Sequence, residues 1–108
     1  MYAFKKGVLS EVTEKSSFDI PIVFALQQNY PNPFNPSTTI KYQLPRAAQV
    51  SLQIYNANGQ LIETLFEGVR PAGYYAQTWQ PKELSSGVYF YRLKTANYVE
   101  TKRLMLLK

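Results

Sequence analysis

The chain has 108 residues, of which 45% are hydrophobic and 15% aromatic, a size and composition that fit one globular domain and argue against intrinsic disorder. It contains no Cys and no His, which excludes disulfide scaffolds, Cys/His zinc sites, thiol catalysis and His-based triads. The formal net charge is +5, and the positive excess lies at the C-terminal end, because residues 92–108 hold five cations and one carboxylate.

We expect residues 1–23 to be a linker or the tail of a preceding domain, because residues 1–18 are charged and weakly periodic. The first residues lack the apolar core of an export signal, so an exported protein would carry that signal in sequence preceding this chain. No apolar stretch approaches the roughly 20 residues of a membrane-spanning helix. The apolar run from Phe18 to Leu26 is interrupted by Pro21, which predicts an edge or entry strand.

Three prolines, Pro31, Pro33 and Pro36, lie within six residues and push the residue before each of them out of the helical region. We therefore expect an extended, stiff segment. One interpretation is a strap that closes one end of the fold. The other is a recognition element, which proline holds extended so that little entropy is lost on binding.

From residue 37 onward the hydrophobic period is two, which is typical of half-buried antiparallel strands. One apolar face holds Ile40, Tyr42 and Leu44, and the next strand places a similar face at residues 50, 52 and 54. The pair Asn58-Gly59 predicts a hairpin with a type I′ turn. A strand over residues 60–67 follows, then a turn-rich connection over residues 68–73.

Three further strands complete the pattern: residues 74–80 with Trp79, residues 88–95, and residues 98–108, which run to the chain end. The strand over residues 88–95 has aromatic and β-branched residues on both of its faces, which predicts a central strand buried on both sides. About seven short strands at this spacing predict an all-β fold, an immunoglobulin-like antiparallel β-sandwich over residues 24–108.

The residue types favour a module that is recognised over an enzyme. Only seven carboxylates are present and the glycines are scattered at turns, so neither a phosphate-binding loop nor a calcium loop can be built. We predict no cofactor and no metal site. We expect no nucleic-acid partner, since the basic residues do not form a dense patch with stacking aromatics; the C-terminal charges could simply keep an edge strand soluble. Trp79 is expected in the core, with a sugar-stacking platform as the alternative.

Five blocks in order carry a resemblance to a known family. They are Asn29–Pro45 (NYPNPFNPSTTIKYQLP), Val50–Leu65, Ala72–Trp79, Ser86–Leu93 and Thr101–Lys108. Together they resemble the type A C-terminal sorting domain of the type IX secretion system, the Por secretion tail family, over about residues 24–108. That family is also similar to the immunoglobulin-like domain of flagellar hook-capping proteins, so fold alone would not separate the two.

The resemblance implies a non-catalytic domain that directs an exported cargo through the type IX outer-membrane translocon of a Gram-negative bacterium. It also implies a surface sortase-like peptidase that removes the domain, and a route through the periplasm to the cell surface or the extracellular space. The candidate sorting and recognition residues are Asn32, Pro33, Phe34, Asn35, Pro36, Gly87, Tyr89, Lys102, Arg103, Leu104, Leu106 and Lys108.

Two other functions stay open from the residues alone. One is an accessory β-sandwich of a secreted glycoside hydrolase that binds carbohydrate or packs against the catalytic domain. The other is a structural assembly module, such as a hook-capping-type domain or a strand-exchanging filament subunit. The gene context would separate them, because a sorting domain follows a large exported cargo.

Overall fold

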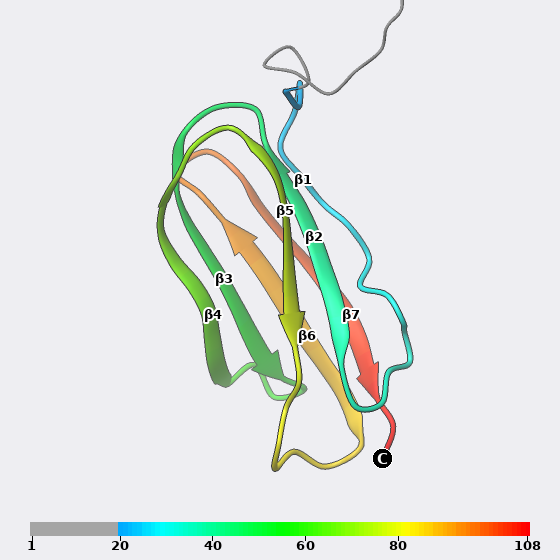
Figure 1. Ribbon diagram of the computed structural model, residues 1–108. Coiled ribbons are helices and arrows are strands. Elements are labelled where there is room, and N and C mark those ends of the chain that lie inside the picture. The colour runs from blue at the N-terminus through cyan, green and yellow to red at the C-terminus, as the bar shows by residue number, and fades with distance from the viewer. Residues whose placement is uncertain (1–19) are drawn as a thin grey trace, which may run out of the picture.

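The computed structural model describes residues 20–108, and within that range the chain forms seven β-strands and no helix (Figure 1). The strands are β1 (Ala25–Leu26), β2 (Thr38–Leu44), β3 (Ala48–Asn56), β4 (Leu61–Arg70), β5 (Gly73–Trp79), β6 (Gly87–Lys94) and β7 (Val99–Leu106). They form two antiparallel sheets, with strand orders β1-β2-β5 and β4-β3-β6-β7. The predicted immunoglobulin-like antiparallel sandwich is therefore confirmed. Most of the expected linker, residues 1–23, lies outside the described residues.

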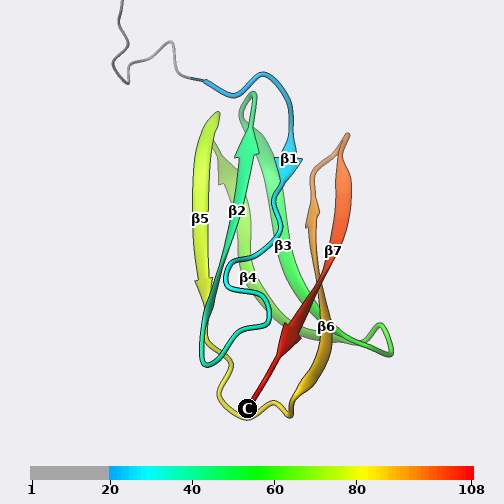
Figure 2. The same ribbon diagram turned by 90° about the vertical axis from the view of Figure 1, so that its right-hand side faces the viewer.

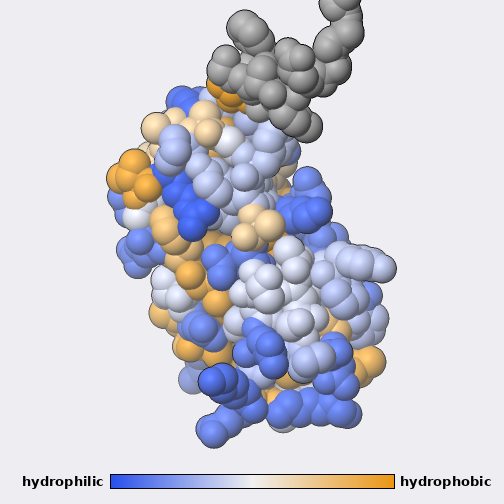
Figure 3. Space-filling model, in the orientation of Figure 1, coloured by the Kyte–Doolittle hydropathy of each residue, from blue (hydrophilic) through white to orange (hydrophobic). Residues whose placement is uncertain are grey.

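The core lies between the two sheets and is built from alternate residues, as the period of two requires. Its 14 buried hydrophobic side chains come mainly from the inward positions of β2, β3, β6 and β7. Residue 20 lies at one end of the sandwich and the C-terminus at the other (Figures 1 and 2). The face seen in Figure 3, over β2 and β5, is mostly hydrophilic, with scattered apolar side chains. No helix among residues 20–108 has the length and apolar character needed to cross a membrane.

The hairpin between β3 and β4 differs from the predicted type I′ turn. The amide of Gly59 donates to the carbonyl of Asn56 at 3.0 Å, so Ala57 and Asn58 are the central turn residues and Gly59 follows them with φ of +84°. This is the three-residue loop in which a left-handed glycine completes the hairpin. The Asn56 side chain accepts from the amides of Asn58 and Gln60, each at 2.9 Å, which stabilises this loop over the shorter turn.

The turn-rich connection predicted over residues 68–73 is much shorter in the structure. Pairing of β3 with β4 continues to Ala48 and Arg70, so only two residues separate β4 from β5, which belongs to the other sheet. The Arg70 guanidinium lies 3.8 Å from the ring centre of Phe66 and 4.6 Å from that of Tyr75. These stacking contacts join the two sheets at the connection between β4 and β5.

Two expectations about the last strands also need correction. Strand β6 is central in its pairing, with β3 on one side and β7 on the other, but only its inward face is buried; Val88, Phe90 and Arg92 on the outward face are half-exposed. The outer face of the sheet has no covering layer among the described residues. Strand β7 ends at Leu106, two residues before the chain end.

Trp79 lies in the core, as predicted, with 2% of its surface exposed. Its ring packs against Phe34 and Tyr89, with ring centres 5.7 and 6.2 Å apart. Its indole Nε1 donates to the Glu63 carboxylate on β4 at 3.0 Å, which satisfies the polar end of a buried ring. Trp79 therefore connects the two sheets, and its ring is not available for sugar stacking in the folded domain.

Replacing Trp79 by Ala should lower the free energy of unfolding by about 3–5 kcal/mol, because it removes a large buried ring and leaves a cavity. Denaturant unfolding measures this cost. Tyr74 on the outer face of β5 is 57% exposed, so Tyr74→Ala is the control and should cost less than about 1 kcal/mol. Equal costs for the two variants would contradict the placement of Trp79.

Candidate functional site

The candidate residues chosen from the sequence fall into three groups by exposure. Those on the surface are Asn32, Pro33, Asn35, Pro36, Arg103 and Lys108. Those half-buried are Gly87 and Lys102, and those buried in the core are Phe34, Tyr89, Leu104 and Leu106. The structure brings most of them together, because residues 27–36 (hereafter the Asn-Pro segment) lie along β7 (Figure 2).

Phe34 attaches the Asn-Pro segment to the end of β7. Its amide donates to the carbonyl of Met105, and its carbonyl accepts from the amide of Leu107, each at 3.0 Å. Its ring is 1% exposed and packs on Trp79. Phe34 thus forms a parallel bridge with Leu106 and inserts a ring between the sheets, so both the last strand and the core depend on it.

Two side chains extend this attachment along the free edge of β7, which is an outer strand of its sheet. The side-chain oxygen of Asn32 accepts from the amide of Met105 at 3.0 Å, and Gln28 Nε2 donates to the carbonyl of Arg103 at 2.7 Å. Unpaired backbone groups on an edge strand invite pairing with another chain. Along residues 103–107, the Asn-Pro segment satisfies four of those groups.

The Asn-Pro segment is itself held by a buried polar network that the sequence analysis missed. The Tyr91 hydroxyl donates to the carbonyl of Gln27 at 2.6 Å and accepts from the amide of Asn29 at 2.8 Å. The Asn29 side chain donates to Thr38 Oγ1 at 2.9 Å and to the carbonyl of Pro31 at 3.1 Å. Burial raises the pKa of Tyr91 to about 12, so this phenol stays protonated at neutral pH and keeps its donor.

The sequence around the three prolines contains a sign of this network. Asn29 and Thr38 flank the three prolines, and buried polar residues are usually there to satisfy hydrogen bonds. The segment is not the continuously extended element expected from its prolines, because it bends repeatedly between residues 31 and 36. Of the two interpretations, the strap describes its position well. Because several of its residues are exposed, the interpretation as a recognition element also stays open.

Gly87 and Tyr89 lie on the opposite side of β7, in β6. They pair with Leu106 and Leu104 in the antiparallel register. The Tyr89 hydroxyl donates to the carbonyl of Ser85, four residues upstream, at 2.7 Å, which is the tyrosine corner found in immunoglobulin-like sandwiches. The amide of Lys108 donates to Ser86 Oγ at 2.8 Å, so the chain end is attached to the same corner.

Lys102 and Arg103 point to opposite faces of β7, because side chains alternate along a strand. The Lys102 side chain is only 27% exposed and forms an ion pair with Glu100 at 3.2 Å. Glu100 also accepts a hydrogen bond from the Tyr98 hydroxyl. That bond, followed by the ion pair, lowers the pKa of Glu100. Lys102 therefore belongs to a structural cluster at the edge of the sandwich.

The resulting surface combines a polar loop with a cationic strand end. Asn32, Pro33, Asn35 and Pro36 are exposed beside an outward row of β7 that contains Arg103 and Met105, and the tail residues Leu107 and Lys108 continue it. Leu104 and Leu106 point into the core at 0% and 1% exposure. Such a surface can offer amides, apolar side chains and positive charge to a partner. Among residues 20–108, no three His, Cys, Asp or Glu side chains group as a metal site would need.

Replacing Asn32 by Ala should speed hydrogen exchange at the Met105 amide, because that amide loses its acceptor. The bond is exposed, so the free energy of unfolding should fall by less than about 1.5 kcal/mol. Asn35 is also exposed and makes no hydrogen bond among the described residues, so Asn35→Ala is a matched control. If both variants leave the Met105 amide equally protected, Asn32 does not hold β7.

Comparison with known proteins identifies the family. The family model described as secretion system C-terminal sorting domain matches residues 28–107. Neither the curated proteins nor the solved structures give a match. The matched range runs from the Asn-Pro segment to the residue after β7. The chain therefore belongs to the secretion system C-terminal sorting domain family, which confirms the resemblance seen in the sequence.

Proposed function

We propose that residues 24–108 are recognised, as a folded domain, by the type IX outer-membrane translocon, and that they deliver a covalently attached upstream cargo to the cell surface. Family membership supports the coarser part of this statement: a type IX sorting role in a protein exported through the outer membrane, from a family that is generally non-catalytic. The finer part concerns which surface is read and what becomes of the domain afterwards.

The observation that carries the proposal is the joining of two distant segments into one surface. The Asn-Pro segment and the end of β7 are more than 60 residues apart in sequence, and backbone hydrogen bonds through Phe34 hold them together. A partner that reads both segments therefore binds only a domain whose last strand is in place. Such a signal identifies a folded domain, and an unfolded tail would lack it.

The candidate residues then divide into two roles. Asn32, Pro33, Asn35 and Pro36, with Arg103 and Lys108, are exposed and can contact the translocon. Phe34, Tyr89, Leu104 and Leu106 are buried and contribute by positioning the surface. Gly87 pairs with Leu106 and shapes the corner, and Lys102 contributes through its pair with Glu100.

We further propose that a surface sortase-like peptidase separates cargo and domain within residues 1–23. These residues precede β1 and the whole of the matched range, so cleavage there would leave the sandwich intact. Mass spectrometry of the released domain would locate the bond. A released fragment that begins inside residues 24–108 would contradict this part of the proposal.

The sorting role is tested by fusing the chain behind a reporter with a signal peptide, in a bacterium that has a type IX system. The wild-type fusion should reach the cell surface. The double variant Arg103→Gln with Lys108→Gln should accumulate in the periplasm, because it removes exposed charges beside the Asn-Pro segment. Its free energy of unfolding should change by less than about 1 kcal/mol.

The matched control is Arg46→Gln with Lys82→Gln, which removes two exposed charges outside the Asn-Pro segment and β7 and should leave delivery unchanged. Failure of the wild-type fusion to leave the periplasm would overturn the sorting role itself. Normal delivery of the Arg103 and Lys108 variant would overturn only the claim that these charges are read.

A further inference from the structure

The outer face of the four-stranded sheet is chemically different from an ordinary solvated face. Five large apolar side chains on it or at its end are 38–70% exposed: Leu61, Val69, Val99, Met105 and Leu107. The strand register places three cations on the same face: Arg92, Lys94 and Arg103. Between described residues, the single ion pair is Lys102–Glu100, so these three cations are not neutralised there.

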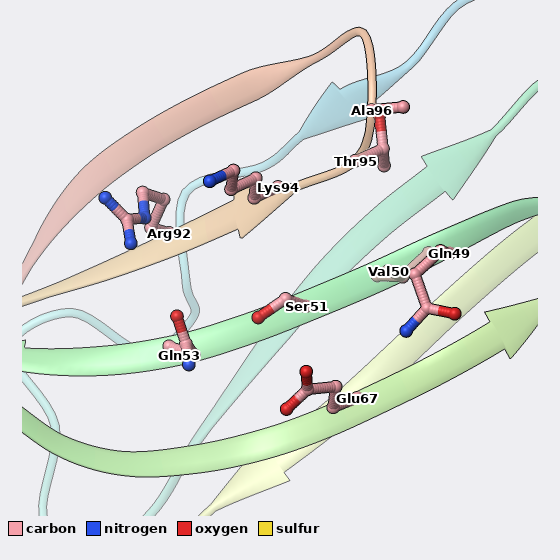
Figure 4. Close-up of a pocket in the computed structure, with 9 residues that line it drawn as sticks. All are labelled: Gln49, Val50, Ser51, Gln53, Glu67, Arg92, Lys94, Thr95 and Ala96. Atoms are coloured by element: carbon pink, nitrogen blue, oxygen red, sulfur yellow. The ribbon is translucent and has the colours of Figure 1, made fainter.

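A hollow of about 380 Å³ lies in this face, next to the turn between β6 and β7. Figure 4 shows Arg92 and Lys94 along β6 on one side, with Ser51 and Gln53 on β3 between them and Glu67 of β4. The register fixes this arrangement, because Ser51 pairs with both Lys94 and Glu67, and Gln53 pairs with Arg92. The turn between β6 and β7, which lines the hollow, lies at the end of the sandwich opposite the C-terminus (Figure 1).

The groups around the hollow retain hydrogen-bonding capacity. Arg92 Nε is buried without a hydrogen-bond partner. The neighbouring Nη2 of the same guanidinium donates to the Tyr55 hydroxyl, and the guanidinium stacks 4.8 Å from the Tyr55 ring centre. Tyr55 thus holds the guanidinium of Arg92 in place, so a fixed positive charge lies beside the hollow. The exposed ammonium of Lys94 lies beside it on the same strand.

We propose that this hollow binds an acidic peptide segment of a partner protein. Arg92 and Lys94 would receive a carboxylate of the segment through charge-assisted hydrogen bonds, which are the stronger kind. On the opposite side, Glu67 and Gln49 would accept peptide N–H groups. The apolar side chains around the hollow, Val69 and Val99 among them, would contact the aliphatic parts of the segment.

A peptide fits this face better than an acidic saccharide. No aromatic ring lines the hollow, and the Tyr55 ring beside it is already stacked by Arg92, so a sugar would find no stacking platform. The inference goes beyond the sorting role and does not depend on it. The sorting surface involves the Asn-Pro segment and the chain end, whereas this hollow lies at the other end of the sandwich.

The test is a titration of the isotope-labelled full chain with acetyl-Gly-Glu-Leu-Glu-Gly-amide, followed by NMR of the backbone amides. We expect shifts concentrated at residues 49–53 and 92–96. Lys94→Gln should weaken binding about ten-fold, since it removes one partner of a charged pair. Lys41→Gln, which removes an exposed charge on the other sheet, should leave it unchanged.

Three results would overturn the proposal. The first is that Lys94→Gln and Lys41→Gln weaken peptide binding equally, or that amides near every Lys and Arg shift. Either result indicates non-specific electrostatic attraction. The second is equal binding of the peptide with Gln in place of both Glu residues. The third is an absence of amide shifts with the peptide. Shifts of the same amides with a digalacturonate probe would then indicate an acidic saccharide as the ligand in place of a peptide. A spectrum of the Lys94→Gln variant that otherwise matches the wild type confirms that it is folded.

Discussion

A single buried hydroxyl, that of Tyr91, holds the N-terminal part of the domain to its central strand. It lies on β6 and binds the carbonyl of Gln27 and the amide of Asn29, residues more than 60 positions earlier in the chain. Phenylalanine there would leave both backbone groups without their partner, at a cost of about 1–3 kcal/mol for each buried group left unsatisfied. These two bonds position the Asn-Pro segment together with backbone bonds from Gln27 and Tyr30 to β2. Asn29 also binds Thr38 and the carbonyl of Pro31.

The other contacts of the proposed sorting surface build on that attachment. Once the Asn-Pro segment lies along β7, Phe34 closes the core beneath Trp79 and satisfies the edge of the last strand. The segment is therefore both strap and surface: its buried residues complete the sandwich, and its exposed residues lie beside the chain end. Under the proposed function, the signal is a shape that exists only when β7 is paired on both sides.

The sequence predicts the sandwich well because inward residues alternate strictly, as Ile40, Tyr42 and Leu44 do. It predicts less well where tertiary contacts override local preference: Asn56 selects a three-residue loop over the Asn58-Gly59 turn, and pairing with β3 extends β4 to Arg70. For the candidate site, the family blocks identify the segments but not the exposure of their residues. The burial of Leu104 and the pairing of Lys102 with Glu100 depend on which face of β7 meets the core.

The central claim is that Tyr91 holds the Asn-Pro segment, and through it β7. Hydrogen exchange of the Tyr91→Phe variant tests this most directly. The amides of Asn29, Phe34 and Leu107 should lose more protection than the β3 amides, since their bonds depend on the attachment while those of β3 report only global unfolding. A uniform loss across the domain, or unchanged protection at Phe34 and Leu107, would contradict the account.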